Sequence, residues 1–384
     1  MASDDSLIGS TLALSVLNAR AAKIPAMKAQ DSKKVLILGV NGFIGHHLTR
    51  AILERTNWSV FGMDVNSDRV SDWMNHERFK FSEGDITINR EWVEYHVRKC
   101  DVVLPLVAIA TPATYVKDPL RVFELDFEAN LPIVRHCVRY RKRLVFPSTS
   151  EVYGACADAE FDPETSTLVY GPIGKHRWIY AAAKQLLDRV IHAHGLRDGL
   201  DYTLFRPFNW IGSGLDSLHT AKEGSSRVLT QFLGHIARGE SIQLVDGGQQ
   251  HRSFTYIDDG IEALLAIIRN PGGRASGQIY NIGNPRNNIS VRQLAELMLK
   301  CARDFPEYSE ASRVKLVETS SQSYYGSGYQ DVQHRVPAIA NTRRDLEWEP
   351  RISMDDALRR IFESYRGEIA VAQKLTDTAG DPAT

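Results

Sequence analysis

The sequence has few cysteines, no excess of charge of either sign and no apolar run of membrane length. Its four cysteines lie far apart, without the Cys-x-x-Cys or Cys/His spacing of a metal site, so we expect free thiols in a reducing compartment and no metal. The 46 lysines and arginines balance 47 aspartates and glutamates, which gives a formal net charge of -1. This balance gives no support to nucleic acid or an anionic membrane as a partner.

The apolar segment SLIGSTLALSVL, near the N-terminus, is the part of the sequence that comes nearest to a signal peptide. Asp4 and Asp5 precede it where a signal peptide carries positive charge, and the segment is too short to span a bilayer. We therefore expect residues 1–33 to form a poorly ordered or partner-docking extension, and the protein to be cytoplasmic.

Hydrophobic patterning predicts the fold class. Continuous apolar runs of strand length, typical of strands buried on both faces, occur at 34–39, 59–64, 101–106, 143–148 and 202–207. Helical patterns lie between them. Strands alternating with helices predict an α/β fold with a Rossmann-type, doubly wound parallel sheet.

A change of pattern near residue 206 predicts a second domain. Beyond it the sequence has short strands, loops and separated helices, including 258–269 and 290–303. We predict an NAD-binding domain at 34–205, a smaller, mainly substrate-binding α/β domain at 206–366, and a tail at 367–384. The second domain would close over the carboxyl edge of the sheet, where open α/β sheets bind ligands.

The motif GVNGFIG follows the first strand and opens a helix. Glycines at 39, 42 and 45 permit a tight turn and let backbone N–H groups approach a pyrophosphate at the positive end of the helix. The second strand ends in Asp64, whose carboxylate can accept the ribose hydroxyls and would repel a 2'-phosphate, which favours NAD over NADP. Asp85, after another short strand, borders the adenine or lies in an exposed turn.

The motif YAAAK places Tyr180 and Lys184 on one helical face, four residues apart. An ammonium beside a phenol favours the phenolate and so lowers the phenol pKa. Such a phenolate can remove a hydroxyl proton while a hydride leaves for the nicotinamide. The YxxxK pattern also occurs by chance on helix surfaces, so it gains meaning from the glycine motif and from STSE at 148–151.

Glu151, in FPSTSEVYG, follows a strand that we expect to be buried. An unpaired buried carboxylate is costly, so Glu151 must face water, pair with a basic residue or have a chemical role.

Several stretches together resemble the extended short-chain dehydrogenase/reductase family over roughly residues 34–366. They are GVNGFIG, LVAIATPATY, STSEVYG, RWIYAAAKQLLDR, LFRPFNWIG, LVDGGQQHRSFTYIDDGIEAL and YYGSGYQDVQHR. Within that family they look like UDP-glucuronate decarboxylases, most closely the decarboxylase half of the bifunctional enzyme of the polymyxin-resistance pathway. The resemblance implies a stand-alone, NAD-dependent decarboxylase of UDP-glucuronate.

The resemblance also implies catalytic roles. Tyr180 would remove the proton of the sugar 4-hydroxyl, with Thr149 orienting that hydroxyl. Ser150 and Arg335 would position the sugar carboxylate or a proton-donating water, and Glu151 would assist proton transfer to C5. Related 4,6-dehydratases carry an aspartate where this chain has Ser150, so the resemblance favours decarboxylation over water elimination.

Two binding sets follow from the same resemblance. The implied cofactor-binding residues are Gly39, Gly42, Phe43, Ile44, Gly45, Asp64, Asp85, Ile86, Ala108, Tyr180 and Lys184. The implied substrate-binding residues are Ala110, Tyr115, Thr149, Asn209, Arg227, Gln243, Val245, Gln250, Arg252 and Tyr329. Arg227 and Arg252 are the candidates for the diphosphate, because guanidinium groups match its oxygens. Either could instead be a solvated surface arginine.

Some alternatives stay open. Close relatives either release the UDP-4-keto-pentose or reduce it to UDP-xylose, and we expect a mixture. A 4-epimerase or dehydratase of a neutral UDP-sugar, or an NAD-binding sensor without turnover, is a different class of function. Apiose synthases use cysteines where this chain has Ala110 and Ser150, which argues against ring contraction. The family implies a homodimer or higher homo-oligomer, and residues 308–328 form either a static loop or one that orders on substrate.

Overall fold

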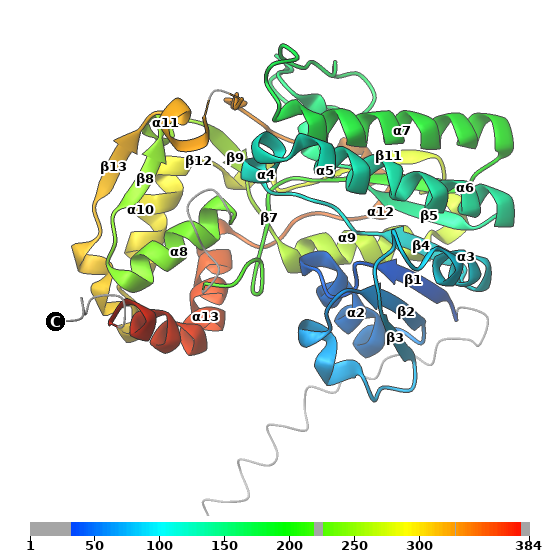
Figure 1. The fold of residues 1–384 in the computed structure, drawn as a ribbon, viewed down its shortest axis with the longest axis horizontal. Helices are drawn as coiled ribbons and strands as arrows, with labels where there is room; N and C mark the ends of the chain where they lie inside the picture. The colour runs from blue at the N-terminus through cyan, green and yellow to red at the C-terminus, as the bar shows by residue number, and fades with distance from the viewer. Residues whose placement is uncertain (1–31, 219–225, 327, 378–384) are drawn as a thin grey trace, which may run out of the picture. The chain divides into compact units, whose positions relative to one another are not determined.

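The structure, a computed structural model, describes residues 32–218, 226–326 and 328–377 (Figure 1). The N-terminal extension expected at residues 1–33 lies almost wholly outside the described residues. Residues 33–384 form one compact unit, which is described here. None of the described helices is both long enough and apolar enough to cross a bilayer.

A seven-stranded parallel sheet forms the centre of the unit, which confirms the predicted fold class. Its strands, in spatial order, are β11 (Gln278–Ile282), β6 (Tyr202–Pro207), β5 (Arg143–Pro147), β4 (Val102–Pro105), β1 (Lys34–Leu38), β2 (Ser59–Asp64) and β3 (Phe79–Glu83). Leu36 of β1 pairs with Phe61 of β2 on one side and Val103 of β4 on the other. All five predicted strands are present.

Helices cover both faces of this sheet, as its continuous apolar strands require. Val35 and Ile37 pack into a core shared with α2 (Phe43–Arg55) and α9 (Ile257–Arg269). Leu36 and Leu38 pack on the opposite face against a core shared with α3 (Arg90–Lys99), α6 (Asn130–Tyr140) and α7 (Trp178–Asp198). Figure 1 shows α6 and α7 on one side of the sheet and α2 and α9 on the other.

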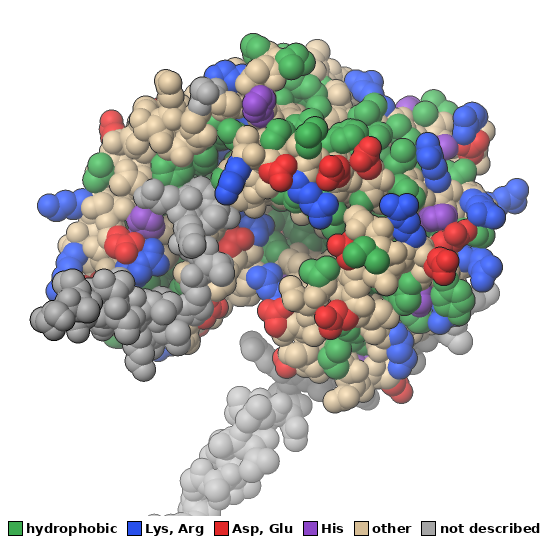
Figure 2. All heavy atoms as spheres, viewed as in Figure 1, with side chains coloured by type: hydrophobic (Ala, Val, Ile, Leu, Met, Phe, Trp, Pro, Cys, Tyr) green, Lys and Arg blue, Asp and Glu red, His purple; other side chains and the backbone are tan. Residues whose placement is uncertain are grey.

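A smaller group of elements follows β6. Its strand pairs are β8 (Ile242–Val245) with β13 (Leu316–Thr319), β9 (His251–Ser253) with β12 (Asn288–Ser290), and β7 (Trp210–Ile211) with β10 (Thr255–Tyr256). Its helices include α8 (Val228–Arg238), α10 (Val291–Ala302) and α13 (Met354–Asp377). Figure 2 shows the surface hollowed between this group and the helices over the sheet.

The remaining elements are short. They are η3 (Asp68–Trp73), α4 (Pro112–Lys117), α5 (Pro119–Phe123), η4 (Glu124–Glu128), η5 (Ser150–Tyr153), η6 (Asp246–Gly248), η7 (Pro271–Gly273), η8 (Pro285–Asn287), η9 (Pro306–Arg313), α11 (Ser321–Tyr325) and α12 (Ala340–Leu346).

Three features of the described residues were not part of the sequence-based expectation, and the predicted domain bounds stay a prediction. The chain returns to the central sheet after residue 206, because β11 pairs with β6 and α9 packs beside α2. The predicted tail at 367 is still helical, since α13 continues to Asp377 and buries Ile369. Residues 308–328, expected to form a loop, contain part of η9 together with β13 and α11.

Candidate functional site

The glycine loop between β1 and α2 leaves no room for side chains. Gly39 has a φ of +85°, and a Cβ added there would lie 3.1 Å from backbone atoms of Leu106 and Val107. A Cβ on Gly45 would lie 2.3 Å from the carbonyl oxygen of Gly39. Gly42 precedes α2, and no side chain caps that helix, so its first N–H groups are available to an anion.

Asp64 braces the glycine loop from the end of β2. Its carboxylate accepts hydrogen bonds from the backbone N–H groups of Asn41, at 2.9 Å, and Val65, at 2.8 Å. Burial raises the pKa of this carboxyl group more than the backbone hydrogen bonds lower it. Both bonds lie at the end of β2, beside the glycine loop. The predicted contact of Asp64 with the ribose hydroxyls stays a prediction.

Asp85 and Ile86 lie apart from the loop. The carboxylate of Asp85 accepts hydrogen bonds from the backbone N–H and the hydroxyl of Thr87, both at 2.7 Å, which lower its pKa. Ile86 is buried and lines a separate pocket between α3 and α6, with His136 among its neighbours. The predicted contact of Asp85 with adenine, and the predicted contact of Ile86 with the cofactor, therefore stay predictions.

A cavity of about 390 Å³ begins at the glycine loop and brings most of the predicted catalytic and cofactor-binding residues together. Its lining includes Gly39, Gly42, Phe43, Ile44, Gly45, Ala108, Ala110, Tyr115, Thr149, Ser150, Glu151, Tyr180, Lys184, Asn209, Arg227 and Arg335.

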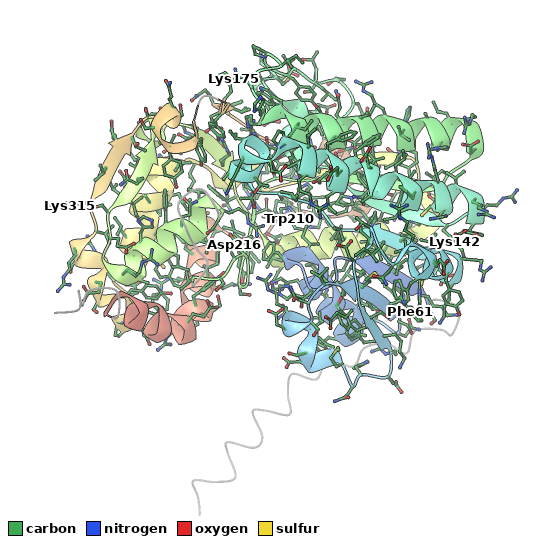
Figure 3. The ribbon with its side chains drawn as sticks, in the orientation of Figure 1. Phe61, Lys142, Lys175, Trp210, Asp216 and Lys315 are labelled. Atoms are coloured by element: carbon green, nitrogen blue, oxygen red, sulfur yellow. The ribbon has the colours of Figure 1, made fainter. Side chains whose placement is uncertain are left out.

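A second cavity, of about 170 Å³, adjoins the first. The predicted substrate-binding residues in its lining are Asn209, Arg227, Gln243, Val245, Gln250, Arg252 and Tyr329. Both linings include Glu151, Asn209, Trp210, Arg227 and Arg335, so the two cavities meet at these side chains. Figure 3 labels Trp210 and Asp216 in the middle of the molecule, between the sheet and the smaller group of elements.

Tyr180 and Lys184 are buried on α7 beside the end of β5. The ring of Tyr115 stacks on that of Tyr180, with 4.7 Å between centroids. Burial raises the pKa of Tyr180 well above its usual value, the charge of Asp126 raises it further, and a hydrogen bond with Thr149 lowers it. The net shift is opposite to the lowering predicted from the YAAAK spacing. The Lys184 ammonium lies 3.4 Å from Oδ1 of Asp126, so its charge is already partnered.

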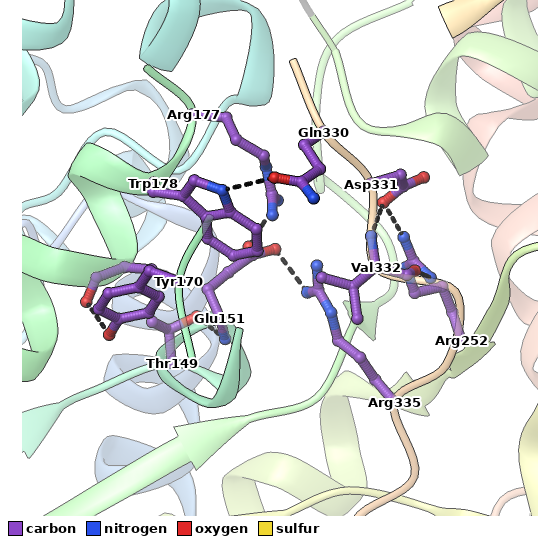
Figure 4. A network of polar contacts seen from close by, with 11 residues as sticks. Thr149, Glu151, Tyr170, Arg177, Trp178, Arg252, Gln330, Asp331, Val332 and Arg335 are labelled. Carbon is purple, nitrogen blue, oxygen red and sulfur yellow. Dashed lines mark hydrogen bonds and ion pairs between the residues drawn. The ribbon is translucent and has the colours of Figure 1, made fainter. Parts of the chain in front are cut away.

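Glu151 lies between two guanidinium groups (Figure 4). It accepts a hydrogen bond from Arg177 at 2.6 Å and one from Arg335 at 2.5 Å, and both arginine side chains are almost fully buried. Burial raises the pKa of the Glu151 carboxyl group, but the charges of Arg177 and Arg335 outweigh burial and bring it down to about 2. Glu151 is therefore paired with basic residues, which was one of the alternatives left open by the sequence, and it also lines the cavity. A chemical role for Glu151 stays a prediction.

The two arginines expected at the diphosphate each have an acidic partner. Arg252 donates to Oδ1 of Asp331 at 2.6 Å, and Arg227 donates to Oδ1 of Asp216 at 2.6 Å. Asn209 has a φ of +40°, a left-handed conformation that is uncommon for a residue other than glycine. Its buried side-chain oxygen has no hydrogen-bond partner among the described residues. Such strain, beside an unpartnered polar atom, favours a role in binding.

Sequence reasoning missed three charged residues of the site: Asp126, Arg177 and Asp331. Arg177 lies just before α7, three residues before Tyr180, and this helical spacing could have indicated it. Asp126 and Asp331 carry no local signal, because only the fold brings them to Lys184 and Arg252. Within the described ranges, no group of three His, Cys, Asp or Glu side chains is arranged to hold a metal ion.

Replacing Gly45 with alanine should disrupt the glycine loop. Because the new Cβ would overlap the carbonyl oxygens of Gly39 and Val40, we expect a loss of about 1–3 kcal/mol of stability and at least about tenfold weaker NAD binding. Thermal melting and a fluorescence titration with NAD would measure these effects. Gly367→Ala is the matched control, since Gly367 is exposed on α13 with open space around it. Unchanged NAD binding by Gly45→Ala would contradict the prediction.

Solved structures that are similar to this chain include proteins from three organisms. PbgP3 protein from Burkholderia pseudomallei is 67% identical, with a TM-score of 0.81, over 90% of this chain and 99% of that one. UDP-glucose 4-epimerase from Thermotoga maritima, with UDP-glucose, is 22% identical, with a TM-score of 0.72, over 88% of this chain and 99% of that one. UDP-glucuronic acid 4-epimerase from Bacillus cereus, in complex with UDP-glucuronic acid and NAD, is 19% identical, with a TM-score of 0.72, over the same shares. The last two show a likeness of fold alone.

The family comparison agrees with the geometry of the glycine loop and the Tyr180 cavity. Residues 35–283, well over half of the chain, match the NAD dependent epimerase/dehydratase family. This range contains the glycine loop, Glu151, Tyr180 and Lys184. The extended short-chain dehydrogenase/reductase resemblance predicted from the motifs is confirmed, and the chain belongs to the NAD dependent epimerase/dehydratase family.

Proposed function

We propose that the protein is an NAD-dependent decarboxylase of UDP-glucuronate, which forms UDP-4-keto-pentose and reduces part of it to UDP-xylose. One observation carries the proposal. Arg177 and Arg335 share the single carboxylate of Glu151 in the cavity that contains Tyr180. These three side chains carry one positive charge in excess, and a buried excess charge favours an anionic ligand. A sugar with a carboxylate meets that requirement.

The residues present fit NAD as the cofactor. The crowded glycines and the uncapped start of α2 suit a pyrophosphate, and Asp64 stands at the end of the neighbouring strand. The Lys184 ammonium is buried and has no hydrogen-bond partner within the described part of the chain, which leaves donors for a ligand hydroxyl. When bound, NAD supplies the two-electron redox chemistry that the protein's own side chains lack.

Tyr180 would act first, as the base that removes the proton of the sugar 4-hydroxyl. Thr149, buried and hydrogen-bonded to Tyr180, would orient that hydroxyl. The ring of Tyr115 covers the face of Tyr180 and restricts its motion. Because the pKa of Tyr180 is raised in the ligand-free protein, the phenol begins protonated. It must lose that proton before oxidation begins, so that the phenolate can accept the proton of the 4-hydroxyl and end the step protonated.

Once C4 is a ketone, the sugar carboxylate is β to a carbonyl group and can leave as CO2. The electron pair of the broken bond then forms an enolate, which the protonated Tyr180 would stabilise through a hydrogen bond. Arg335 and Ser150 would position the carboxylate and the water that protonates C5. Glu151, with a pKa of about 2, is charged at neutral pH and cannot itself donate that proton. We therefore assign Glu151 to holding Arg177 and Arg335 in place.

The second cavity would hold the nucleotide. Arg227 and Arg252 would face the diphosphate, and Asn209 would contribute its unpartnered oxygen or its amide. The segment from Gln243 to Gln250 would hold the uracil.

The expected dimer also stays a prediction. Leu120 of α5 is 70% exposed and Leu196 of α7 is 78% exposed, and a second copy packed on these helices would cover such apolar side chains.

The test is to incubate the protein with UDP-glucuronate and excess NAD and to quantify CO2, NADH and the sugar nucleotides. CO2 in step with NADH and UDP-4-keto-pentose supports the releasing decarboxylase, and CO2 with UDP-xylose and little NADH supports complete re-reduction. UDP-galacturonate without CO2 would identify a 4-epimerase. NAD binding without any change of a UDP-sugar would favour the sensor. The presence of both Tyr180 and Lys184 in the cavity argues against a sensor without turnover.

A further inference from the structure

A π-helical turn interrupts the helices that follow the cavity segment 106–111. Residues Glu124–Glu128 form this turn, η4, between α5 and α6, and the N–H of Ala129 donates to the carbonyl of Glu124 at 2.8 Å. The side-chain amide of Asn130 donates to the carbonyl of Leu125, within the turn, at 2.9 Å. π-Turns are rare and are frequently found at functional sites.

The side chain that this turn presents is Asp126, which is fully buried. Its Oδ2 accepts a hydrogen bond from the backbone N–H of Ile109 at 3.0 Å, and its Oδ1 lies 3.4 Å from Nζ of Lys184. Ala108 and Ala110, on either side of Ile109, line the cavity. One carboxylate therefore ties the π-turn, the wall of the cavity and α7 together.

We propose that Asp126 is a positioning residue, which holds the Lys184 ammonium at the cavity wall through a buried ion pair that the π-turn makes possible. Its effect on the reaction rests on the proposed function, whereas the ion pair itself does not. A buried ammonium with no partner would cost several kcal/mol, so Lys184 needs an anion. The carboxylate takes up only one side of the ammonium, and its other N–H groups stay available to a ligand.

The same carboxylate acts on Tyr180, one helical turn before Lys184. Its negative charge opposes formation of the phenolate and adds to the effect of burial on the pKa of Tyr180. Removing this charge would lower that pKa, and Tyr180 would then lose its proton at a lower pH. The other charged or titratable groups that face Tyr180 and Lys184 are Tyr115, Glu151, Asp188 and Arg227.

Asp126→Asn tests the proposal, because asparagine keeps the shape and removes the charge. We expect the acidic limb of the pH profile of kcat/KM to move to lower pH by about one unit. A second readout needs neither substrate nor NAD: the near-ultraviolet absorbance of tyrosinate is titrated against pH. Asp126→Asn is compared with Asp126→Asn/Tyr180→Phe, and the unaltered protein is compared with Tyr180→Phe. The difference assigns the ionisation of Tyr180, which should also move to lower pH.

Asp259→Asn is the matched control, since Asp259 is a buried carboxylate on α9 that accepts the backbone N–H groups of Arg351 and Ile352 away from the cavity. The control should shift neither the pH profile of kcat/KM nor the tyrosinate titration. If Asp126→Asn lost activity at every pH and likewise shifted neither, the proposal would be overturned. Failure to decarboxylate UDP-glucuronate would leave the tyrosinate titration intact as a test. If Asp126→Asn does not fold, the melting temperatures of Lys184→Met and Lys184→Met/Asp126→Asn test the ion pair instead. Lys184→Met leaves the buried Asp126 carboxylate without its cation, so the double variant should melt at a higher temperature. A double variant that melts no higher than Lys184→Met would contradict the ion pair.

Discussion

Tyr180→Phe is expected to lower kcat by roughly 10²–10⁴-fold with UDP-glucuronate, the usual contribution of a positioned acid or base. The change removes one oxygen from a ring that stays stacked on Tyr115, with 4.7 Å between centroids, so the shape of the cavity should persist. We therefore expect NAD and UDP-glucuronate to bind with nearly unchanged Kd. Steady-state kinetics and titration calorimetry would separate the two effects.

Tyr308→Phe is the matched control for this loss. It also removes a hydroxyl from a buried tyrosine, one that donates to the carbonyl of Phe362, away from the cavity. Its kcat should equal that of the unaltered protein, with a melting temperature lowered as one lost hydrogen bond requires. Retention of more than a tenth of the activity by Tyr180→Phe would show that another group removes the proton, and the proposed mechanism would then be wrong.

Local sequence was enough to predict most strands of the central sheet and part of the site. β1 and β2 are runs of residues buried on both faces, and the glycine motif lies where the chain must turn from β1 into α2. Tyr180 and Lys184 share a helical face because their spacing is four residues. In each case the constraint acts between residues that are near one another in the chain, so the pattern is visible without the fold.

The rest depends on contacts between distant residues. β11 joins the sheet beside β6 although seventy residues, 208–277, lie between them, and a five-residue strand carries no sign of its neighbour. Asp126 meets Lys184 only because a π-turn rotates it inward, and no local pattern predicted that turn. The shift of the Tyr180 pKa was predicted in the wrong direction because the lysine was visible in the sequence, whereas the burial of the phenol, which is the larger cause, and the charge of Asp126 were not.

Arg335→Met is expected to weaken the binding of UDP-glucuronate by roughly 10–100-fold, as loss of a charged hydrogen bond in a buried site would, while UDP-glucose binds as before. Without Arg335, Glu151 and Arg177 cancel each other and the excess positive charge disappears. Glu151 itself keeps a partner, so folding should survive. Calorimetry with the two sugar nucleotides gives the ratio of Kd values, and CO2 release should fall with it.

Glu151→Gln tests the same charge balance by removing the anion instead of one of the two cations. Removing the carboxylate frees both guanidinium groups, so UDP-glucuronate should bind at least as tightly, yet decarboxylation should slow because Arg335 loses the anion that fixes its position. Arg359→Met, which removes an exposed arginine paired with Asp304, is the control and should change neither quantity. If Arg335→Met weakened UDP-glucose equally, Arg335 would belong to the diphosphate site. If Arg335→Met left turnover unchanged, the substrate would be a neutral UDP-sugar and the decarboxylase proposal would fail.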